Sequence, residues 1–238
     1  MAISAANNAK NIIVGASPLF LSVATTGDSS LDPTVGSNKE AFSSSASYTD
    51  TLNAATAKWK NVGFTNNGLQ ITYNPTYGNV TVDQLLDSAK LFKESMEVMI
   101  ATEMAEGVLE NVLAVFGQPG TISGGSVTTV TASETLTSAD PTSSTPKQLG
   151  LAAGALLSAP VERQLVAVGP APDYAITSYI KNERVYYARR VLSVQQSQFS
   201  LARNTPTTFP VTFRLLPTAM TGYEGQEYGK IIDRVLAV

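Results

Sequence analysis

The chain has 238 residues, of which 43% are hydrophobic and 15% are charged, and its formal net charge is −3. It contains no cysteine and no histidine, which excludes disulfides, thiolate metal sites and every catalytic pair in which a histidine activates a serine or cysteine. The mildly acidic balance also gives no reason to expect a protein that clamps nucleic acid. Composition therefore argues against an enzyme, and the low charge suits a secreted domain or a subunit that buries much of its surface.

No segment of the sequence predicts export or membrane insertion. The first residues, MAISAANNAKNIIVG, lack a basic start and a long apolar run, so they do not predict a signal peptide. The longest apolar stretch, Leu149–Pro160, is well short of the ~20 residues that a spanning helix needs. We therefore expect a soluble protein that is made in the cytoplasm.

Residues 1–57 predict a strand region followed by a long loop. Residues Asn11–Ala24 are apolar and β-branched, and Gly15 and Pro18 interrupt them, which is typical of a strand or of a strand pair with a bulge. The residues that follow are rich in Ser, Thr, Asp and Gly, which indicates a surface loop. Because so long a loop is unusual inside a compact domain, we expect an arm that becomes ordered against a partner.

Residues Asn61–Gln84, NVGFTNNGLQITYNPTYGNVTVDQ, predict a meander of strands. Asn67 and Gly68 tolerate the positive φ of a tight hairpin turn, so we expect them to separate the strand NVGFT from the strand LQITY. The stretch NPTYG, which contains Pro75 and Gly78, predicts a second turn before the strand NVTVD.

Residues Ser95–Met104 predict a strand. Their Glu and Met content favours a helix, but the strict alternation of two kinds of side chain is the stronger signal. The more polar face of this strand carries Glu97 and Glu103.

Residues Ala105–Gly117 change to helical spacing and predict one short amphipathic helix that packs on a sheet. Glu103 and Glu106 lie where the start of a helix favours negative charge. Gly117 is a natural residue to end the helix, and Pro119 prevents its continuation. The expected core face of the helix consists of Val108, Leu109, Val112, Leu113 and Phe116.

The remainder of the chain is predicted to be mainly strand. Residues 118–147 are rich in Ser and Thr and predict a loop or a hairpin, with a strand near Ser126–Thr131. The later segments VERQLVAV, YAITSYI, RVYYARRVLSVQQSQFS, TFPVTFRLLP and YGKIIDRVLAV are all β-rich. Pro210 restricts its strand to an edge or bulge position.

We expect no catalytic, cofactor-binding or metal site. Paired carboxylates are the remaining catalytic option, but Glu94 and Glu97 have opposite parity on a strand, and Glu103 and Glu106 span the strand–helix junction. The glycine-rich GQPGTISGG lacks the Lys-Ser/Thr of a phosphate-binding loop.

The tyrosines leave a binding alternative open. They are either a platform for a ligand or ordinary strand residues with a polar tip. The candidates are Tyr73, Tyr77, Tyr186, Tyr187, Tyr223 and Tyr228.

Charge is unevenly distributed along the chain. Residues 81–110 contain seven acids and two lysines, a net charge of −5, whereas residues 181–214 contain six bases and one acid, a net charge of +5. The two segments are either two solvated faces or complementary surfaces within or between subunits.

Several segments, in order, resemble the tail tube proteins, also called major tail proteins, of bacteriophages with long non-contractile tails. The run Trp59–Gln84 resembles the family pattern vG-T-dG-i-y-P…v-vDQ, and MEVMIATEMAEGVLENVLAVFG resembles the strand and helix that follow it. NIIVGASPLFLSVA looks like the opening strand pair, and FPVTFRLLPT…GYEGQEYGKIIDRV is similar to the closing strands. Residues 118–147 and LGLAAGALL lie outside the resemblance.

The resemblance implies that residues 1–238 form a single tail tube domain, a β-sandwich or barrel with one flanking helix. Six copies would form a ring whose inner strands join into a continuous barrel, and rings would stack into a tube within the virion tail. Glu97 and Glu103 are then expected to face the lumen, and the loop near residues 27–57 to contact the next ring.

The same resemblance implies assembly in the host cytoplasm, without a membrane or a cofactor. Double-stranded DNA would pass through the lumen without specific binding, and the implied protein partners are the tape-measure, tail terminator and tail-tip proteins. Two other functions stay open. One is a carbohydrate-binding or adhesive β-sandwich, and the other is the inner tube of a contractile tail or secretion system.

Overall fold

The computed structural model describes residues 13, 15–23, 52, 58–85, 87–117, 121–123, 126–128, 149, 151, 161–172, 180–219 and 222–237. These residues are mainly strand, and every strand pair among them is antiparallel. One short helix, α3 (Leu109–Val115), accompanies the strands. The predicted mainly β class is therefore confirmed for the described part of the chain.

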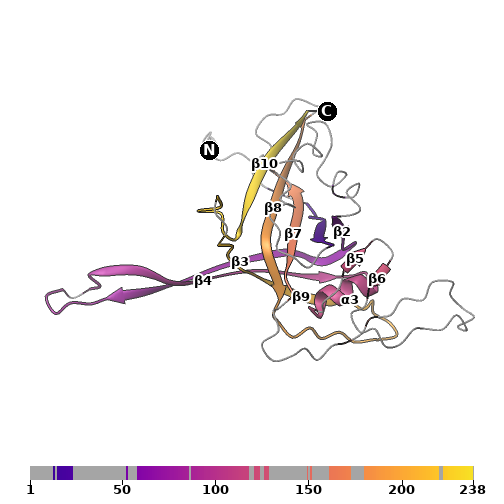
Figure 1. The fold of residues 1–238 in the computed structure, drawn as a ribbon, viewed down its shortest axis with the longest axis horizontal. Helices are drawn as coiled ribbons and strands as arrows, with labels where there is room; N and C mark the ends of the chain where they lie inside the picture. Colours follow the sequence, from indigo (N-terminus) through magenta and orange to yellow (C-terminus); the bar gives the residue numbers. More distant parts are fainter. Residues whose placement is uncertain are drawn as a thin grey trace, which may run out of the picture.

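One sheet has eight strands, which follow the order β2-β1-β7-β8-β9-β4-β3, with β10 paired to β8 (Figure 1). A separate two-stranded hairpin joins β5 to β6. The strands are β1 (Leu19–Ser22), β2 (Trp59–Asn61), β3 (Thr65–Val80), β4 (Lys90–Met104), β5 (Thr121–Ser123), β6 (Ser126–Thr128), β7 (Arg163–Pro170), β8 (Ile180–Ser193), β9 (Phe209–Leu215) and β10 (Gly229–Ala237).

Strand β8 changes partners along its length. Residues Ile180–Ala188 pair with β10, whereas Val191–Ser193 pair with β9. The sheet therefore divides at β8 into one half with β1, β2, β7 and β10 and another half with β9, β4 and β3. In Figure 1, β8 runs steeply across the nearly horizontal β3 and β4, and β10 lies beside the part of β8 above them.

The main core lies between these two halves. One buried cluster contains Leu19 from β1 and Leu165 from β7 together with Ile100 from β4, Phe213 from β9 and Leu113 from α3. A second cluster, which includes Trp59, covers the other face of β7. Strand β7 is buried along nearly its whole length because both of its faces are covered.

The predicted meander in residues Asn61–Gln84 is wrong. Residues Thr65–Val80 form one continuous strand, β3, that pairs with β4 and passes through both expected turns. Asn67 and Gly68 do have positive φ, 60° and 69°, but they form a bulge, because residues 67–69 lie opposite Thr102 alone. Pro75 is tolerated because β4 is the only strand that pairs with β3 among the described residues.

The predicted strand Ser95–Met104 is confirmed as part of β4, and the predicted strand in TFPVTFRLLP is confirmed as β9. Val98, Ile100, Thr102 and Met104 are buried, whereas the residues between them are partly exposed. Pro210 has a neighbour on one side only, since β8 pairs with β9 no further than Phe213.

The helix is shorter than predicted. The N–H of Ala105 donates to the carbonyl of Phe64 (2.8 Å), so residue 105 continues the pairing of β4 instead of starting a helix. Helix α3 follows Val108 and ends at Val115, with Phe116 as its C-cap. Gly117 comes directly after the cap with a φ of 60°, which confirms its predicted place just past the helix.

The predicted core face of the helix is correct only in part. Leu113 is fully buried, Val112 and Phe116 pack at the edge of the core, Leu109 is partly buried, and Val108 is 39% exposed. The buried side of α3 also carries Glu110 and Asn111. Asn111 is buried because its amide donates to the carbonyls of Val62 (2.8 Å) and Glu106 (2.9 Å).

Several predictions fall wholly or partly outside the described residues. Of residues 1–57, the structure describes β1, a few neighbouring residues and Leu52, so the expected arm lies outside it. Within residues 118–147, the hairpin of β5 and β6 agrees with the predicted hairpin, and the rest is not described.

Candidate assembly interface

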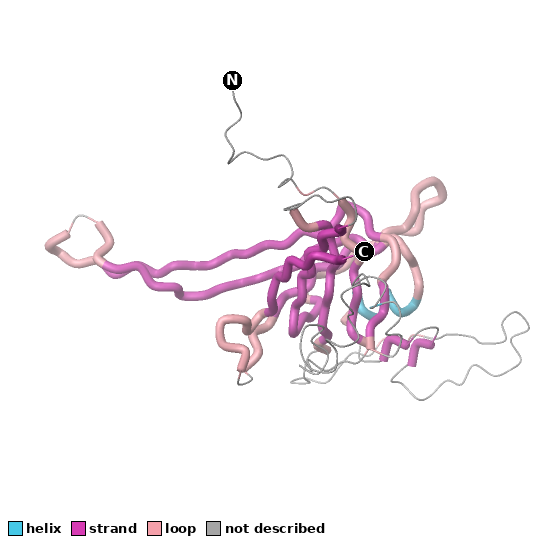
Figure 2. The backbone as a smooth tube through the Cα atoms, turned by 90° about the horizontal axis from the view of Figure 1, so that it is seen from above, coloured by secondary structure: helices cyan, strands magenta, loops and turns pink. Residues whose placement is uncertain are grey.

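The hairpin of β3 and β4 projects well beyond the rest of the described fold, as both backbone views show (Figures 1 and 2). Strand β9 pairs with β4 only over Met99–Met104. Among the described residues, the outer part of β4, from Lys90 to Val98, therefore has β3 as its one strand neighbour. A two-stranded ribbon leaves both faces open and is marginal in water without further packing.

One face of the hairpin continues the hydrophobic core into solvent. Ile71 lies opposite Ile100, and Tyr73 lies opposite Val98, so these cross-strand neighbours share the core-facing side. Ile100 and Val98 are buried, but Ile71 is 45% and Tyr73 is 57% exposed. Apolar surface that faces water in a row of this kind is typical of a surface that a partner covers.

Further hydrophobic side chains are exposed toward the tip of the hairpin. These residues are Tyr77, Val80, Val82, Leu85, Leu91 and Phe92. The sequence signal for them is the apolar content of VTVDQLLDSAKLF on both strand parities, which a strand with one buried face does not show.

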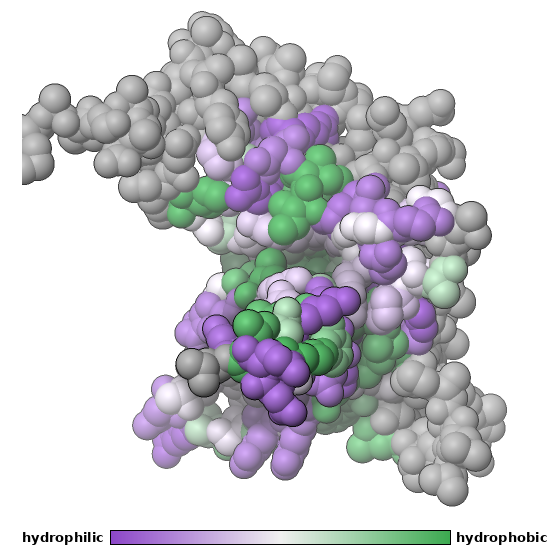
Figure 3. Space-filling view, turned by 90° about the vertical axis from the view of Figure 1, so that its left-hand side faces the viewer, coloured by the Kyte–Doolittle hydropathy of each residue, from purple (hydrophilic) through white to green (hydrophobic). Residues whose placement is uncertain are grey.

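A groove of about 400 Å³ lies where the base of the hairpin faces β8 and β10. Its lining is mostly apolar, and Lys230 is its one charged residue. Ile231 of β10 is 64% exposed at this place. Figure 3 looks toward the hairpin tip and shows hydrophobic surface on the hairpin and in the recess behind it. The remaining lining residues are Ile71, Tyr73, Met96, Val98, Ile100, Tyr186, Tyr187, Ala188, Leu215, Tyr228 and Gly229.

Four of the six candidate tyrosines line this groove, namely Tyr73, Tyr186, Tyr187 and Tyr228. The hydroxyl of Tyr187 already donates to Gln164 (2.7 Å), and the hydroxyl of Tyr228 donates to the carbonyl of Met96 (3.4 Å). A sugar site needs converging polar groups, which this lining supplies poorly. The geometry therefore suits an apolar protein segment better than a carbohydrate.

The other two candidate tyrosines lie elsewhere. Tyr77 is 59% exposed on the outer hairpin, and Tyr223 stacks on the guanidinium of Arg189, 3.7 Å from its ring centre. The guanidinium of Arg189 also donates to the carbonyl of Gln226 (3.1 Å), so Arg189 and Tyr223 hold the loop that precedes β10.

The opposite face of β4 is polar. Glu97 forms an ion pair with Arg214 of β9 (3.6 Å), and Glu103 accepts a hydrogen bond from the amide of Asn66 (3.1 Å). Both carboxylates point away from the core, as strand parity predicts. The predicted role of Glu103 and Glu106 at a helix start is wrong, because Glu106 instead accepts from the backbone N–H of Phe64 (3.0 Å) and α3 begins three residues later.

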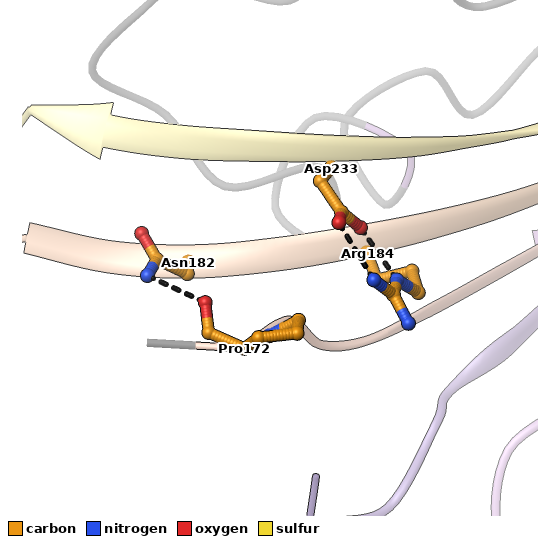
Figure 4. A network of polar contacts seen from close by, with 4 residues as sticks. All are labelled: Pro172, Asn182, Arg184 and Asp233. Atoms are coloured by element: carbon orange, nitrogen blue, oxygen red, sulfur yellow. Dashed lines mark hydrogen bonds and ion pairs between the residues drawn. The ribbon is translucent and has the colours of Figure 1, made fainter. Parts of the chain in front are cut away.

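The basic segment is neutralised mostly by acids from outside the acidic segment. Arg184 of β8 makes a two-pronged ion pair with Asp233 of β10, at 2.5 and 2.6 Å (Figure 4). Arg190 makes a similar pair with Glu162. Arg214 with Glu97 links the two charged segments within one subunit. The hydrogen bond from Arg184 holds the pKa of Asp233 below its usual value.

The described residues contain no group of three or more acids that would hold a metal ion. No helix in the described part of the chain is long and apolar enough to cross a membrane. No protein-family model matches the chain, and no curated protein matches it at a significant level.

Proposed function

We propose that the protein is the structural subunit of a bacteriophage tail tube of the long non-contractile type. In this proposal, hexameric rings stack into a tube in the virion tail, and genomic DNA passes through the lumen. The observation that carries the proposal is the uncovered apolar surface of the β3–β4 hairpin and of the groove at its base. A single subunit leaves this surface in water, and an assembly of copies would cover it.

The open edges of the sheet support the same proposal. Among the described residues, β3 pairs only with β4 and β10 pairs only with β8. Long unpaired edges invite association, and a ring that joins edges between subunits removes them. The polar face with Glu97 and Glu103 is the surface that we assign to the lumen. Its carboxylates would repel phosphate, although Glu97 also pairs with Arg214 of β9.

The proposal needs no catalytic group and no cofactor. The partners that it requires are further copies of the chain, a tape-measure protein in the lumen, and terminator and tip proteins at the two ends. The inner tube of a contractile tail would use the same surfaces, so a sheath gene beside the gene of this chain would favour that alternative.

Negative-stain microscopy of concentrated, purified protein tests the proposal. We expect rings or tubes with a central hole. A matched variant, in which an Asn-Gly turn joins Thr76 to Ser95 in place of residues 77–94, should stay folded but remain monomeric, because Thr76 and Ser95 are opposite each other. A wild-type chain that remains monomeric at high concentration would contradict the proposal.

A further inference from the structure

We propose that the groove between β10 and the base of the hairpin, called the seat below, binds the hairpin tip of a second copy of this chain. The tip is the turn region that carries Val82, Leu85 and Leu91. The inference rests on the proposed function in that both require self-association. It goes further because it specifies which two surfaces meet.

The tip presents apolar side chains that are exposed in the described part of the chain. Leu85 is 57% exposed, Leu91 is 66% exposed and Val82 is 38% exposed. Backbone hydrogen bonds hold the described residues on either side of the turn, because the N–H of Leu85 donates to the carbonyl of Val82 (3.1 Å) and the N–H of Ala89 donates to that of Val80 (2.8 Å). A segment already held in shape loses little conformational entropy when it binds.

The seat and the tip are alike in polarity. The seat has a volume of about 400 Å³, which falls within the usual range of binding pockets, and its lining is mostly apolar. The exposed apolar side chains of the tip would lose their contact with water in such a groove.

The tip cannot reach the groove of its own subunit. Ile71 lines the groove, and Val80 at the end of β3 lies nine positions further along the same strand. At about 3.3 Å per residue, the tip lies roughly 30 Å away along the strand. The paired strands point the tip away from the body of the molecule (Figures 1 and 2). A tip that binds in the groove must therefore belong to another copy of the chain.

The tip and the groove are two different surfaces of the same chain. When two copies bind through one tip and one groove, the pair still has one unused tip and one unused groove. Such a heterologous contact either closes into a ring or continues without end. The inferred contact therefore has the open character that a growing tube requires, and it does not depend on residues outside the described part of the chain.

Disulfide trapping tests the inference, since the chain has no cysteine of its own. A Leu85→Cys/Ile231→Cys variant should form a ladder of cross-linked species on mild oxidation. A mixture of the two single variants should give dimers that neither variant gives alone. The matched control is Leu85→Cys/Thr72→Cys, because Thr72 is exposed on the opposite face of β3 and should give no ladder.

The same samples, viewed by negative-stain microscopy, separate the two proposals. Tubes together with a ladder would support both the proposed function and the binding of the tip in the seat. Tubes without a ladder would contradict binding in the seat but not the proposed function, and a ladder without rings or tubes would do the reverse. If neither tubes nor a ladder form at high protein concentration, both proposals are wrong.

Discussion

Individual polar side chains connect the elements of this fold through hydrogen bonds. The amide of Asn111 in α3 donates to the carbonyl of Val62, just before β3, and to the carbonyl of Glu106, just after β4. Arg163 donates to the carbonyls of Ser22 and Val23, both at 3.1 Å, and its burial lowers its pKa to about 10. Such groups stabilise a fold only while their partners are present, because an unpartnered buried carbonyl is costly.

The Asn111→Leu variant tests the connection at α3. Removing the amide leaves two carbonyls without a donor, so we expect a loss of about 1–3 kcal/mol in the free energy of unfolding. Chemical denaturation measures the loss. Asn74→Leu, at an exposed position of β3, should change stability by less than about 0.5 kcal/mol. Equal effects of the two substitutions would contradict the assigned role of Asn111.

The ion pair of Arg184 with Asp233 predicts a dependence of stability on acid. The pKa of Asp233 is lowered in the folded state by the hydrogen bond from Arg184. The stabilisation is therefore fully present above the unfolded pKa of about 3.9 and is lost as the pH falls through the lower folded pKa. Because the pair is partly exposed, its contribution should be at most about 1 kcal/mol.

Unfolding measured from pH 6 to pH 2 checks this expectation. At pH 6, the free energy of unfolding of the wild-type chain should be larger than that of Asp233→Asn. This difference should disappear as the pH approaches 2. A difference that stays constant over this range would show that the pairing does not stabilise β10 on β8.

At the scale of elements, the feature that shapes the candidate interface is the bulge in β3. It inserts Asn67 and Gly68 with positive φ into β3, near the base of the hairpin. A second register shift against β4 lies further out, between Thr76 and Tyr77. The hydroxyl of Thr102, which lies opposite the bulge, donates to the carbonyl of Gly68 (2.9 Å). Bulges increase the twist and bend of a strand, so this one sets the direction in which the hairpin leaves the sheet.

Replacing Gly68 by Val should disturb that direction. The Gly68 φ of 69° is unfavourable for a β-branched residue, while no atom lies within 4 Å to clash with an added side chain. We expect a conformational cost of about 1–3 kcal/mol and impaired formation of rings, judged by sedimentation. The control is Thr72→Val, which places the same side chain in the same strand at ordinary φ. Normal assembly of the Gly68 variant would refute this role for the bulge.

The comparison of β3 with its sequence shows what local patterns can predict. The preference of Asn67 and Gly68 for positive φ was predicted correctly, but the same preference serves a hairpin turn and a bulge. The choice between them depends on β4, whose long alternation offers a partner along all of β3. The start of α3 was predicted too early for a similar reason, because Phe64 pairs with Ala105 from a distant part of the chain.

The candidate site could be predicted less well than the fold. Strand parity placed Glu97 and Glu103 on the face opposite the core. The groove, in contrast, combines Ile71 with Ile231, which are 160 residues apart in the sequence and meet only because β10 pairs with β8, which crosses the hairpin. No local pattern carries that information.

Considered as a whole, the described fold combines a well-packed core with an exposed hydrophobic surface. The core between the two halves of the sheet is well covered, while the hairpin, the groove and the edges of β3 and β10 are open among the described residues. In the proposed assembly, copies of the subunit cover one another's exposed hydrophobic surface. In the proposed tube, the polar side of β4 would stay in contact with water and DNA.

An electron cryo-microscopy map of the assembled particle would show directly whether copies of the chain form a tube. We predict stacked rings with six-fold symmetry, a lumen wall that carries Glu97 and Glu103, and hairpins buried between subunits. A particle whose hairpins stay in solvent, or whose lumen is lined by the face that carries Ile71 and Tyr73, would contradict this prediction.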